Sequence, residues 1–279
     1  MQSLHNLSAL SYDLRQKVVD MIVAGGGGHI GGDMSVIDIL VTLYFDQMNI
    51  SPENATDPNR DLFVLSKGHS VEAYYAVLAE KGFFSHEEVK ENFSKFGSAY
   101  IGHPNNKLPG IEMNSGSLGH GLPVCVGMAL ACKRDGKSNR VYVVMGDGEL
   151  AEGSVWEGAM AASHYKLDNL CAIIDRNRLQ ISGCTEDVMA HDSQEERWAA
   201  FGWHVISVDG NSIPALQGAF EEAKSVKGKP TLVIANTTKG CGSSVMENKA
   251  NWHHKVPNAE EYHRIMADLQ ARKEAYLHE

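Results

Sequence analysis

Short apolar runs alternate with amphipathic stretches along this chain. Continuous apolar segments, which are typical of strands buried on both faces of a sheet, occur at residues 63–65, 141–145, 170–174, 203–208 and 231–235. Between them, apolar residues recur every three or four positions, which predicts helices. The alternation of the two patterns predicts an α/β fold, namely a three-layer, doubly wound, mostly parallel sheet with helices on both faces.

The helical pattern covers most of the chain outside these strands. Helices are expected over residues 3–24, 33–47, 70–81, 86–96, 119–134, 212–226 and 258–277, with one more after Gly148. The helix over residues 258–277 is expected to lie exposed on the surface. Polar or glycine-rich stretches at 51–61, 97–118 and 184–195 are expected to be loops, and a loop as long as 97–118 is usually either functional or disordered.

Composition restricts the class of protein. A formal net charge of −10 over 279 residues argues against a nucleic-acid partner. No apolar run reaches membrane length and the N-terminus lacks a signal-peptide core, so we expect no membrane association. The five cysteines are widely spaced and form no CxxC, which predicts reduced thiols and a cytoplasmic location. Because there is no linker, repeat or low-complexity tract, residues 1–279 are expected to form one domain.

Polar residues follow the two central strands at the points where they end. Gly146-Asp147-Gly148 follows the run 141–145, and Asp175-Arg176-Asn177 follows the run 170–174. Because ligands bind at the carboxyl ends of parallel strands, Asp147 and Asn177 are expected to lie together there. With a backbone carbonyl, their oxygens would form half of a cage for a hard cation such as Mg²⁺, which diphosphate oxygens would complete. Gly148 and the helix after it favour an anion. Alternatively, these segments are only a tight turn and a solvated loop.

Two histidines lie in turns between predicted elements and are further candidates for ligand contact. His29 follows a run of glycines, and Gly26-x-Gly28-x-x-Gly31 formally matches a dinucleotide-binding fingerprint. Since this segment follows a helix rather than a strand, we discount that match. His69 lies at the carboxyl end of the run 63–65 and is expected to contact a ligand. The alternatives are a solvated His29, and a helix-capping or buried structural His69.

The central segment resembles the thiamine diphosphate motif, which begins with GDG and closes with Asn about 30 residues later, and the chain as a whole resembles transketolase. The matching phrases are GHIGG at 28–32, FVLSKGH at 63–69, GHPNNKLPGIEMNSGSLGHG at 102–121, GDGELAEGSVWEG at 146–158, and NTTKGCGS followed by WHHKVP at 236–257. They cover only the diphosphate-binding half of a transketolase. The chain therefore resembles the N-terminal subunit of a split transketolase, and the resemblance implies a thiamine diphosphate-binding fold in which 97–118 is an ordered loop lining the cofactor.

The resemblance also implies roles for individual residues. The metal ligands, for Mg²⁺ or Ca²⁺, would be Asp147, Asn177 and the backbone carbonyl of Leu179. The thiamine diphosphate contacts would be His69, Gly116, Ser117, Leu118, Gly146, Asp147, Gly148, Glu149, Asn177 and His253. The hydroxyls of the donor sugar would be bound by His29, His69, His103 and His253. Glu152 and Glu157 would link two cofactors across a subunit interface, although complementation of a helix dipole explains these two residues nearly as well.

The implied reaction is transfer of a two-carbon ketol unit from a ketose phosphate, or a modified ketose, to an aldose. The glutamate that activates thiamine belongs to the pyrimidine-binding domain of such enzymes. The resemblance therefore implies a second chain, the C-terminal transketolase subunit, in an assembly with two copies of each chain. His254 replaces a frequent Gly and His120 a usual Gln, which leaves the donor open. Two other hypotheses remain: the alpha-type subunit of a 2-oxo acid dehydrogenase, which the histidine set disfavours, and a non-catalytic thiamine diphosphate-binding protein.

Overall fold

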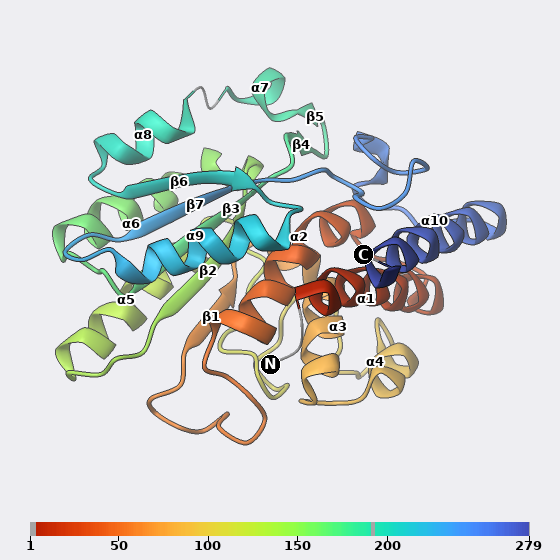
Figure 1. Ribbon diagram of the computed structural model, residues 1–279, viewed down its shortest axis with the longest axis horizontal. Coiled ribbons are helices and arrows are strands. Elements are labelled where there is room, and N and C mark those ends of the chain that lie inside the picture. The colour runs from red at the N-terminus through yellow and green to blue at the C-terminus, as the bar shows by residue number, and fades with distance from the viewer. Residues whose placement is uncertain (1–3, 191–192, 279) are drawn as a thin grey trace.

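A five-stranded, entirely parallel sheet forms the centre of the molecule. The computed structural model describes residues 4–190 and 193–278. The sheet has the order β1-β2-β3-β7-β6, and each adjacent pair of strands is parallel. Its strands are β1 (Leu62–Leu65), β2 (Val141–Gly146), β3 (Leu170–Arg176), β7 (Thr231–Asn236) and β6 (His204–Asp209). With helices on both faces, this confirms the predicted doubly wound architecture (Figure 1).

Side chains of the strands alternate between two apolar cores. Tyr142 and Val144 of β2 pack on one face of the sheet, whereas Val141, Val143 and Met145 pack on the other. Alternation follows from the pleat, which turns successive side chains to opposite faces. The first core includes α1 (Leu4–Gly25), α2 (Ile30–Thr42), α3 (Val71–Lys81), α4 (His86–Asn92), α9 (Ile213–Ser225) and α10 (Ala259–His278). The second includes α5 (Gly121–Arg134), α6 (Gly153–His164) and α8 (Gln194–Ala200).

Two of the expected helices differ in detail. The helix expected over 33–47 begins at Ile30, is buried around its whole circumference and ends at Thr42, where a π-helical turn, Leu43–Gln47, continues it. The closing helix, α10, is mostly exposed, as expected, but one side of it packs against α1, as Figure 1 shows on the right. Ile265 and Leu269 of α10 are fully buried in this contact. The prediction did not locate this contact, because two buried apolar residues in a charged helix give a weak periodic signal.

The segment expected to be a polar loop, 184–195, contains more structure than predicted. A short hairpin, β4 (Leu179–Gln180) with β5 (Gly183–Cys184), precedes it, and α7 (Thr185–Val188) and the start of α8 lie within it. α8 is held by buried Trp198, whose ring packs against Trp156 and Trp203. The sequence did not predict α8, because a single buried aromatic residue produces no periodic pattern. Residues 191–192 of this segment, and Ser3 of the first expected helix, lie outside the described residues.

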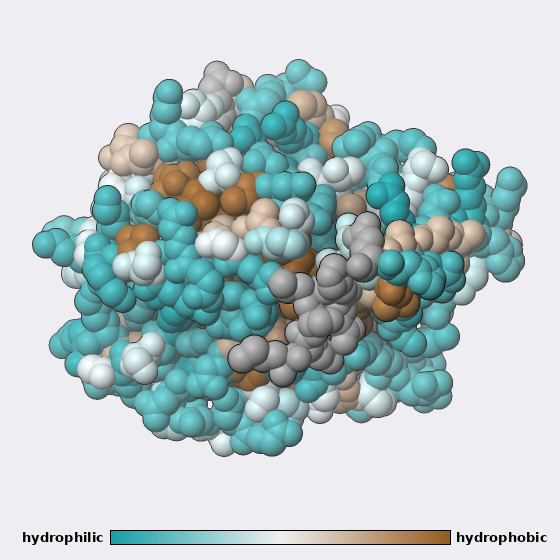
Figure 2. Space-filling view, in the orientation of Figure 1, coloured by the Kyte–Doolittle hydropathy of each residue, from teal (hydrophilic) through white to brown (hydrophobic). Residues whose placement is uncertain are grey.

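The remaining segments agree with the sequence. Residues 97–118 contain no helix or strand, and the five thiols are unpaired. Within residues 4–190 and 193–278, no helix is long and apolar enough to cross a membrane. The face shown in Figure 2 is mostly hydrophilic, with some apolar atoms above the partly exposed edge strand β6. All five strands point the same way, so the segments that follow them meet at one edge of the sheet.

Candidate functional site

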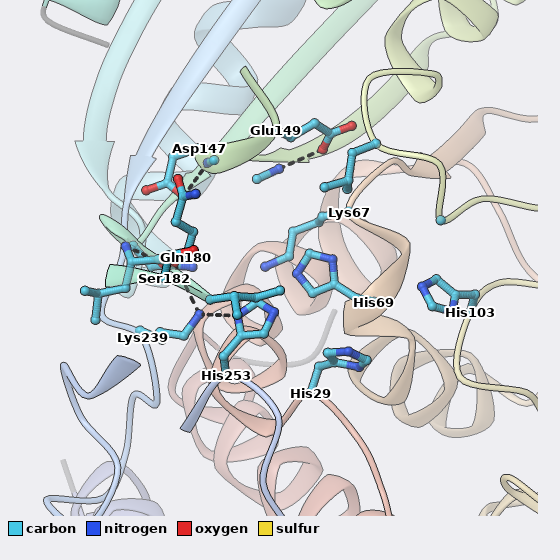
Figure 3. A pocket seen from close by; sticks show the side chains of 17 residues that line it. His29, Lys67, His69, His103, Asp147, Glu149, Gln180, Ser182, Lys239 and His253 are labelled. Atoms are coloured by element: carbon cyan, nitrogen blue, oxygen red, sulfur yellow. Dashed lines mark hydrogen bonds between the residues drawn. The ribbon is translucent and has the colours of Figure 1, made fainter. Parts of the chain in front are cut away.

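A cavity of about 350 Å³ lies at the carboxyl edge of the sheet. Figure 3 shows the side chains around it, which come from segments far apart in sequence. Its lining consists of His29, Lys67, His69, His103, Gly116, Leu118, Gly146, Asp147, Gly148, Glu149, Asn177, Leu179, Gln180, Ile181, Ser182, Lys239 and His253. The fold therefore brings together almost all the residues that the sequence singled out.

Asp147 and Asn177 meet because β2 and β3 are adjacent, with Gly146 opposite Asp175. Asp147 accepts hydrogen bonds from the backbone nitrogens of Gly148 at 2.9 Å and Arg178 at 2.5 Å. Burial, and then the neighbouring charge of Asp175, raise the pKa of Asp147 to about 6. The site thus holds a desolvated carboxylate whose charge is incompletely compensated, which favours the approach of a cation.

The oxygens at this end of the cavity suit a hard cation. They belong to the Asp147 carboxylate, the Asn177 amide and the Leu179 carbonyl, all on the lining of the cavity. No group of three His, Cys, Asp or Glu side chains that could hold a metal occurs among the described residues. Since only one of these three oxygen groups is a carboxylate, a cation bound by them would need further oxygens from a bound anion.

Two buried lysines reach the same end of the cavity. The Lys67 ammonium lies 2.5 Å from Asp175 Oδ2. The Lys239 ammonium donates to the carbonyl oxygen of Leu179 at 3.3 Å and faces His253 Nδ1 at 3.0 Å. Burial, and then the charge of Lys67, lower the pKa of Lys239 to about 8. Two desolvated cations beside the GDG turn make this end of the cavity a strong site for an anion such as a diphosphate.

Four histidines surround the opposite end of the cavity, as Figure 3 shows. The His29 ring centroid lies 5.4 Å from that of His69, 6.2 Å from that of His103 and 5.7 Å from that of His253. His254, outside the main cavity, approaches His29 to 4.7 Å. The set is therefore one cluster rather than isolated solvated rings.

These imidazoles are neutral near pH 7. Burial and the neighbouring charges, beginning with His254, lower the pKa of His29 to about 4. Burial and then the charge of Lys239 lower the pKa of His253 to about 3. Burial lowers the pKa of His69 and of His103 as well. His29 Nδ1 is buried and has no hydrogen-bond partner among the described residues. Neutral imidazoles with free nitrogens can both donate to and accept from hydroxyl groups.

Glu149 lines the cavity, but its carboxylate is occupied by hydrogen bonds from one side chain and two backbone nitrogens. It accepts from Ser66 Oγ, from Gly119 N at 2.8 Å and from Gly146 N at 3.0 Å. These bonds tie the glycine-rich loop before α5 to the end of β2. Gly116 in that loop has φ +136°, and a Cβ there would lie 2.5 Å from the His103 ring, so only glycine fits.

Three predicted site residues lie away from the cavity. Ser117, Glu152 and Glu157 are exposed and do not line it, and His120 is exposed as well. Glu157 lies on α6, and Glu152 immediately precedes that helix. None of the three therefore contributes to the lining of this cavity.

Sequence reasoning missed several residues of the site. Lys67 follows β1 in the segment SKGH, and Lys239 follows β7 in the segment TTKG. Their position directly after a strand could have identified them as site residues. Asp175 is fully buried and accepts from Lys67, from Thr237 and from Ser35 Oγ at 2.6 Å. The hairpin residues Gln180, Ile181 and Ser182 gave no signal, since nothing in their pattern predicted the hairpin.

Comparisons with known proteins agree with this geometry. Residues 8–274 match the family described as transketolase, thiamine diphosphate binding domain. An apulose-4-phosphate transketolase subunit from Phocaeicola vulgatus is 50% identical over 260 residues, which cover 93% of this chain and 92% of the relative. A 6-deoxy-6-sulfo-D-fructose transketolase subunit from a Clostridium species is 40% identical, with 92% and 94% covered.

Solved structures give the same assignment. The transketolase of Campylobacter jejuni superposes with a TM-score of 0.90 at 29% identity over 99% of this chain. The match covers 46% of that transketolase, so this chain spans less than half of its length. The chain belongs to the transketolase family and comprises its thiamine diphosphate-binding domain.

Proposed function

We propose that this chain is the diphosphate-binding subunit of a two-chain transketolase that moves a two-carbon ketol unit from a modified ketose phosphate to an aldose. The observation that carries the proposal is the cavity itself. One end combines Asp147 and Asn177 with two buried lysines, and the other end consists of neutral histidines. The first end suits a diphosphate with a cation, and the second suits a polyhydroxylated substrate.

At the diphosphate end, Asp147, Asn177 and the carbonyl oxygen of Leu179 would bind Mg²⁺ or Ca²⁺ together with the diphosphate oxygens. Lys239 now donates to that carbonyl oxygen, and its ammonium would turn to the diphosphate when a cation takes its place. Lys67 and the backbone of Gly148 would complete the anion site. Gly116, Leu118 and the backbone of Gly146 would contact the remainder of the cofactor. When bound here, thiamine diphosphate would supply the carbanion chemistry that ketol transfer needs.

At the histidine end, His29, His69, His103 and His253 would bind the hydroxyl groups of the donor. The Lys239 ammonium can only donate, so His253 Nδ1 accepts its hydrogen bond and Nε2 carries the ring proton. His253 therefore presents a donor to substrate or cofactor. A neutral ring can donate one hydrogen bond and accept another, which suits a hydroxyl group in a water-poor site.

The chain needs a second polypeptide under this proposal. We expect the glutamate that activates thiamine on a pyrimidine-binding domain carried by that second chain, and the naming of two relatives as subunits supports this. We infer an assembly with two copies of each chain, in which Glu152 and Glu157 lie at the interface rather than in the cavity. Ser117 would reach the cofactor only from the rim of the cavity.

Two further proposals concern the chain as a whole. We infer that residues 1–279 fold as one domain, because both apolar cores share the same sheet. The buried, unpaired thiols of Cys125, Cys132 and Cys171 are in keeping with a reducing compartment such as the cytoplasm. The 2-oxo acid dehydrogenase hypothesis is less well supported, because the histidine cluster has no hydroxyls to bind in a 2-oxo acid.

The experiment is a reconstitution. The chain, a pyrimidine-binding partner chain sought in the neighbouring reading frame, and their mixture are assayed with thiamine diphosphate, Mg²⁺ and ribose 5-phosphate. The donors are xylulose 5-phosphate, apulose 4-phosphate and 6-deoxy-6-sulfofructose. Ketol transfer by the mixture alone is the expected result. Full activity of this chain alone would contradict the two-chain proposal, and consumption of pyruvate alone would favour the 2-oxo acid reaction.

A further inference from the structure

Behind the histidine cluster lies a pair of buried carboxyl groups that the proposed chemistry does not use. Asp33 of α2 and Glu72 of α3 are each 0% exposed. The two groups are neighbours, because Asp33 binds the backbone of Ala73, the residue that follows Glu72. Neither carboxyl group forms a salt bridge with a lysine or arginine of the described residues. Two buried carboxylates in contact repel strongly unless a proton lies between them.

Each carboxyl group of the pair has one oxygen that accepts a hydrogen bond and one oxygen that does not. Asp33 Oδ1 accepts from the backbone nitrogen of Ala73 at 3.1 Å, and Glu72 Oε1 accepts from the backbone nitrogen of His29 at 3.3 Å. The remaining oxygens, Asp33 Oδ2 and Glu72 Oε2, are buried and have no donor within the described part of the chain. A single proton shared by these two oxygens would satisfy both of them.

A glycine makes room for the contact with His29. A Cβ at Gly28 would lie 2.6 Å from Glu72 Oε1. Any larger residue at position 28 would therefore push Glu72 away from the backbone of His29. The acid pair thus joins three segments: the loop that presents His29, the N-terminus of α2 and the N-terminus of α3.

We propose that Glu72 keeps its proton at neutral pH and donates it to Asp33, and that this acid pair positions His29 for the donor sugar. Glu72 is a positioning residue, since it acts through the backbone of His29 and touches no ligand. The positioning role rests on the proposed function, whereas the shared proton does not.

Surrounding charges determine which acid carries the proton. Burial raises the pKa of both groups, and the Asp33 charge raises that of Glu72 well above its ordinary value. Each carboxyl group accepts one backbone N–H from a neighbouring segment, but the positive charges of Lys67 and Lys239 favour the anion at Asp33 in addition. Tyr75, also on α3, lies near Glu72 and is itself held neutral. The proton therefore belongs on Glu72.

A protonated Glu72 has a measurable consequence for stability. Its folded-state pKa lies above its unfolded-state value, so the folded chain binds the proton more tightly. The stability that this provides is complete below the unfolded pKa and is lost as pH rises towards the folded pKa. Relative to a variant without this proton, the unfolding equilibrium constant should rise by at most tenfold per pH unit in that range.

Glu72→Gln is the matched variant, because its amide donates to Asp33 as the protonated acid does, while its oxygen still accepts from His29. Urea unfolding of the full chain is measured from about pH 5 to about pH 8, with exposed Glu91→Gln on α4 as control. As pH rises across this range, the unfolding equilibrium constant of the wild type should increase at least about tenfold relative to that of Glu72→Gln. Glu91→Gln should follow the wild type. Asp33→Asn, which also leaves one carboxyl group, should flatten the same dependence. If both amide variants keep the wild-type pH dependence, the shared proton is refuted.

The positioning role has its own readout in the reconstituted enzyme. Glu72→Leu should raise the donor KM about tenfold with less than about a threefold change in cofactor affinity, and Glu72→Gln should restore the wild-type KM. If Glu72→Leu folds and leaves the donor KM unchanged, His29 is not positioned through Glu72. If the wild-type mixture transfers no ketol unit, the proposed function and the positioning role both fail, and the unfolding measurements decide the shared proton alone.

Discussion

The ammonium group of Lys239 lies 3.0 Å from Nδ1 of His253, and thereby joins the two ends of the cavity. Lys239 follows β7, whereas His253 lies in the loop after the short 3₁₀ turn Ala250–Trp252. The same ammonium reaches the carbonyl oxygen of Leu179, a proposed metal ligand. Diphosphate binding at one end and the tautomer of a substrate-binding histidine at the other thus depend on one side chain.

Replacing Lys239 should therefore affect the cofactor and the substrate together. Lys239→Met removes a desolvated positive charge from the diphosphate end and a donor from His253. We expect the Kd of thiamine diphosphate to rise by at least about tenfold and the donor KM to rise as well. Isothermal titration calorimetry and steady-state kinetics measure the two. Exposed Lys229→Met is the control, and equal cofactor affinity in both variants would contradict the assignment.

The Asp147 carboxylate should be required for cation-dependent cofactor binding. Asp147→Asn keeps an oxygen and the shape of the side chain but removes the charge that binds the cation. In limiting Mg²⁺ we expect cofactor affinity to fall by about a hundredfold, with partial recovery in excess Mg²⁺. Calorimetry on the assembled complex tests this, with exposed Asp187→Asn as control. Unchanged affinity in limiting metal would show that the metal site lies elsewhere.

His103 should act on the sugar rather than on the diphosphate. Its ring lies 6.2 Å from that of His29, and the two share the end of the cavity remote from Asp147. His103→Ala should lower kcat/KM about tenfold to a hundredfold and change cofactor Kd by less than about threefold. A variant that loses cofactor affinity and turnover to the same degree would place His103 at the cofactor instead.

Lys67 should be needed for stability as well as for binding. Its ammonium pairs with fully buried Asp175, so Lys67→Met leaves an uncompensated carboxylate in the interior. We expect a loss of about 3 kcal/mol in the free energy of unfolding, measured by urea denaturation. Adding Asp175→Asn should return part of that loss. No recovery in the double variant would mean that packing, and not charge, accounts for the effect.

The histidine cluster should make the chain sensitive to acid. His29 has its pKa lowered from 6.5 to about 4, so the unfolded chain binds protons more tightly than the folded chain. The stability of the neutral form is complete above about pH 6.5 and is lost as pH falls towards about pH 4. His29→Gln should reduce this loss by about 1 kcal/mol, after allowance for the partial exposure of the ring to solvent. Thermal unfolding across this range measures it, and a variant as acid-sensitive as the wild type would contradict the shift.

Much of the fold follows from local pattern. The buried apolar runs that became β2 and β3 predicted a parallel sheet, and the polar residues after them placed Asp147 and Asn177 at its carboxyl edge. His69 was found from its place at the end of a strand, whereas His29, His103 and His253 were identified through resemblance, since a histidine in a loop carries no periodic signal. A weak pattern failed at α8, which depends on one buried tryptophan, Trp198.

The sequence by itself determined which residues end each strand, because strand periodicity and chain order are local properties. Only the tertiary structure decided which of those ends are neighbours. β7 lies between β6 and β3 in the sheet. Its pairing with β3 brings Lys239 to Leu179, 60 residues away along the chain. Packing of α2 against α3 likewise brings Glu72 to the backbone of His29, 43 residues earlier. Such contacts arise from strand order and helix packing, and the energies of burial and charge that they create exist only after the chain has folded.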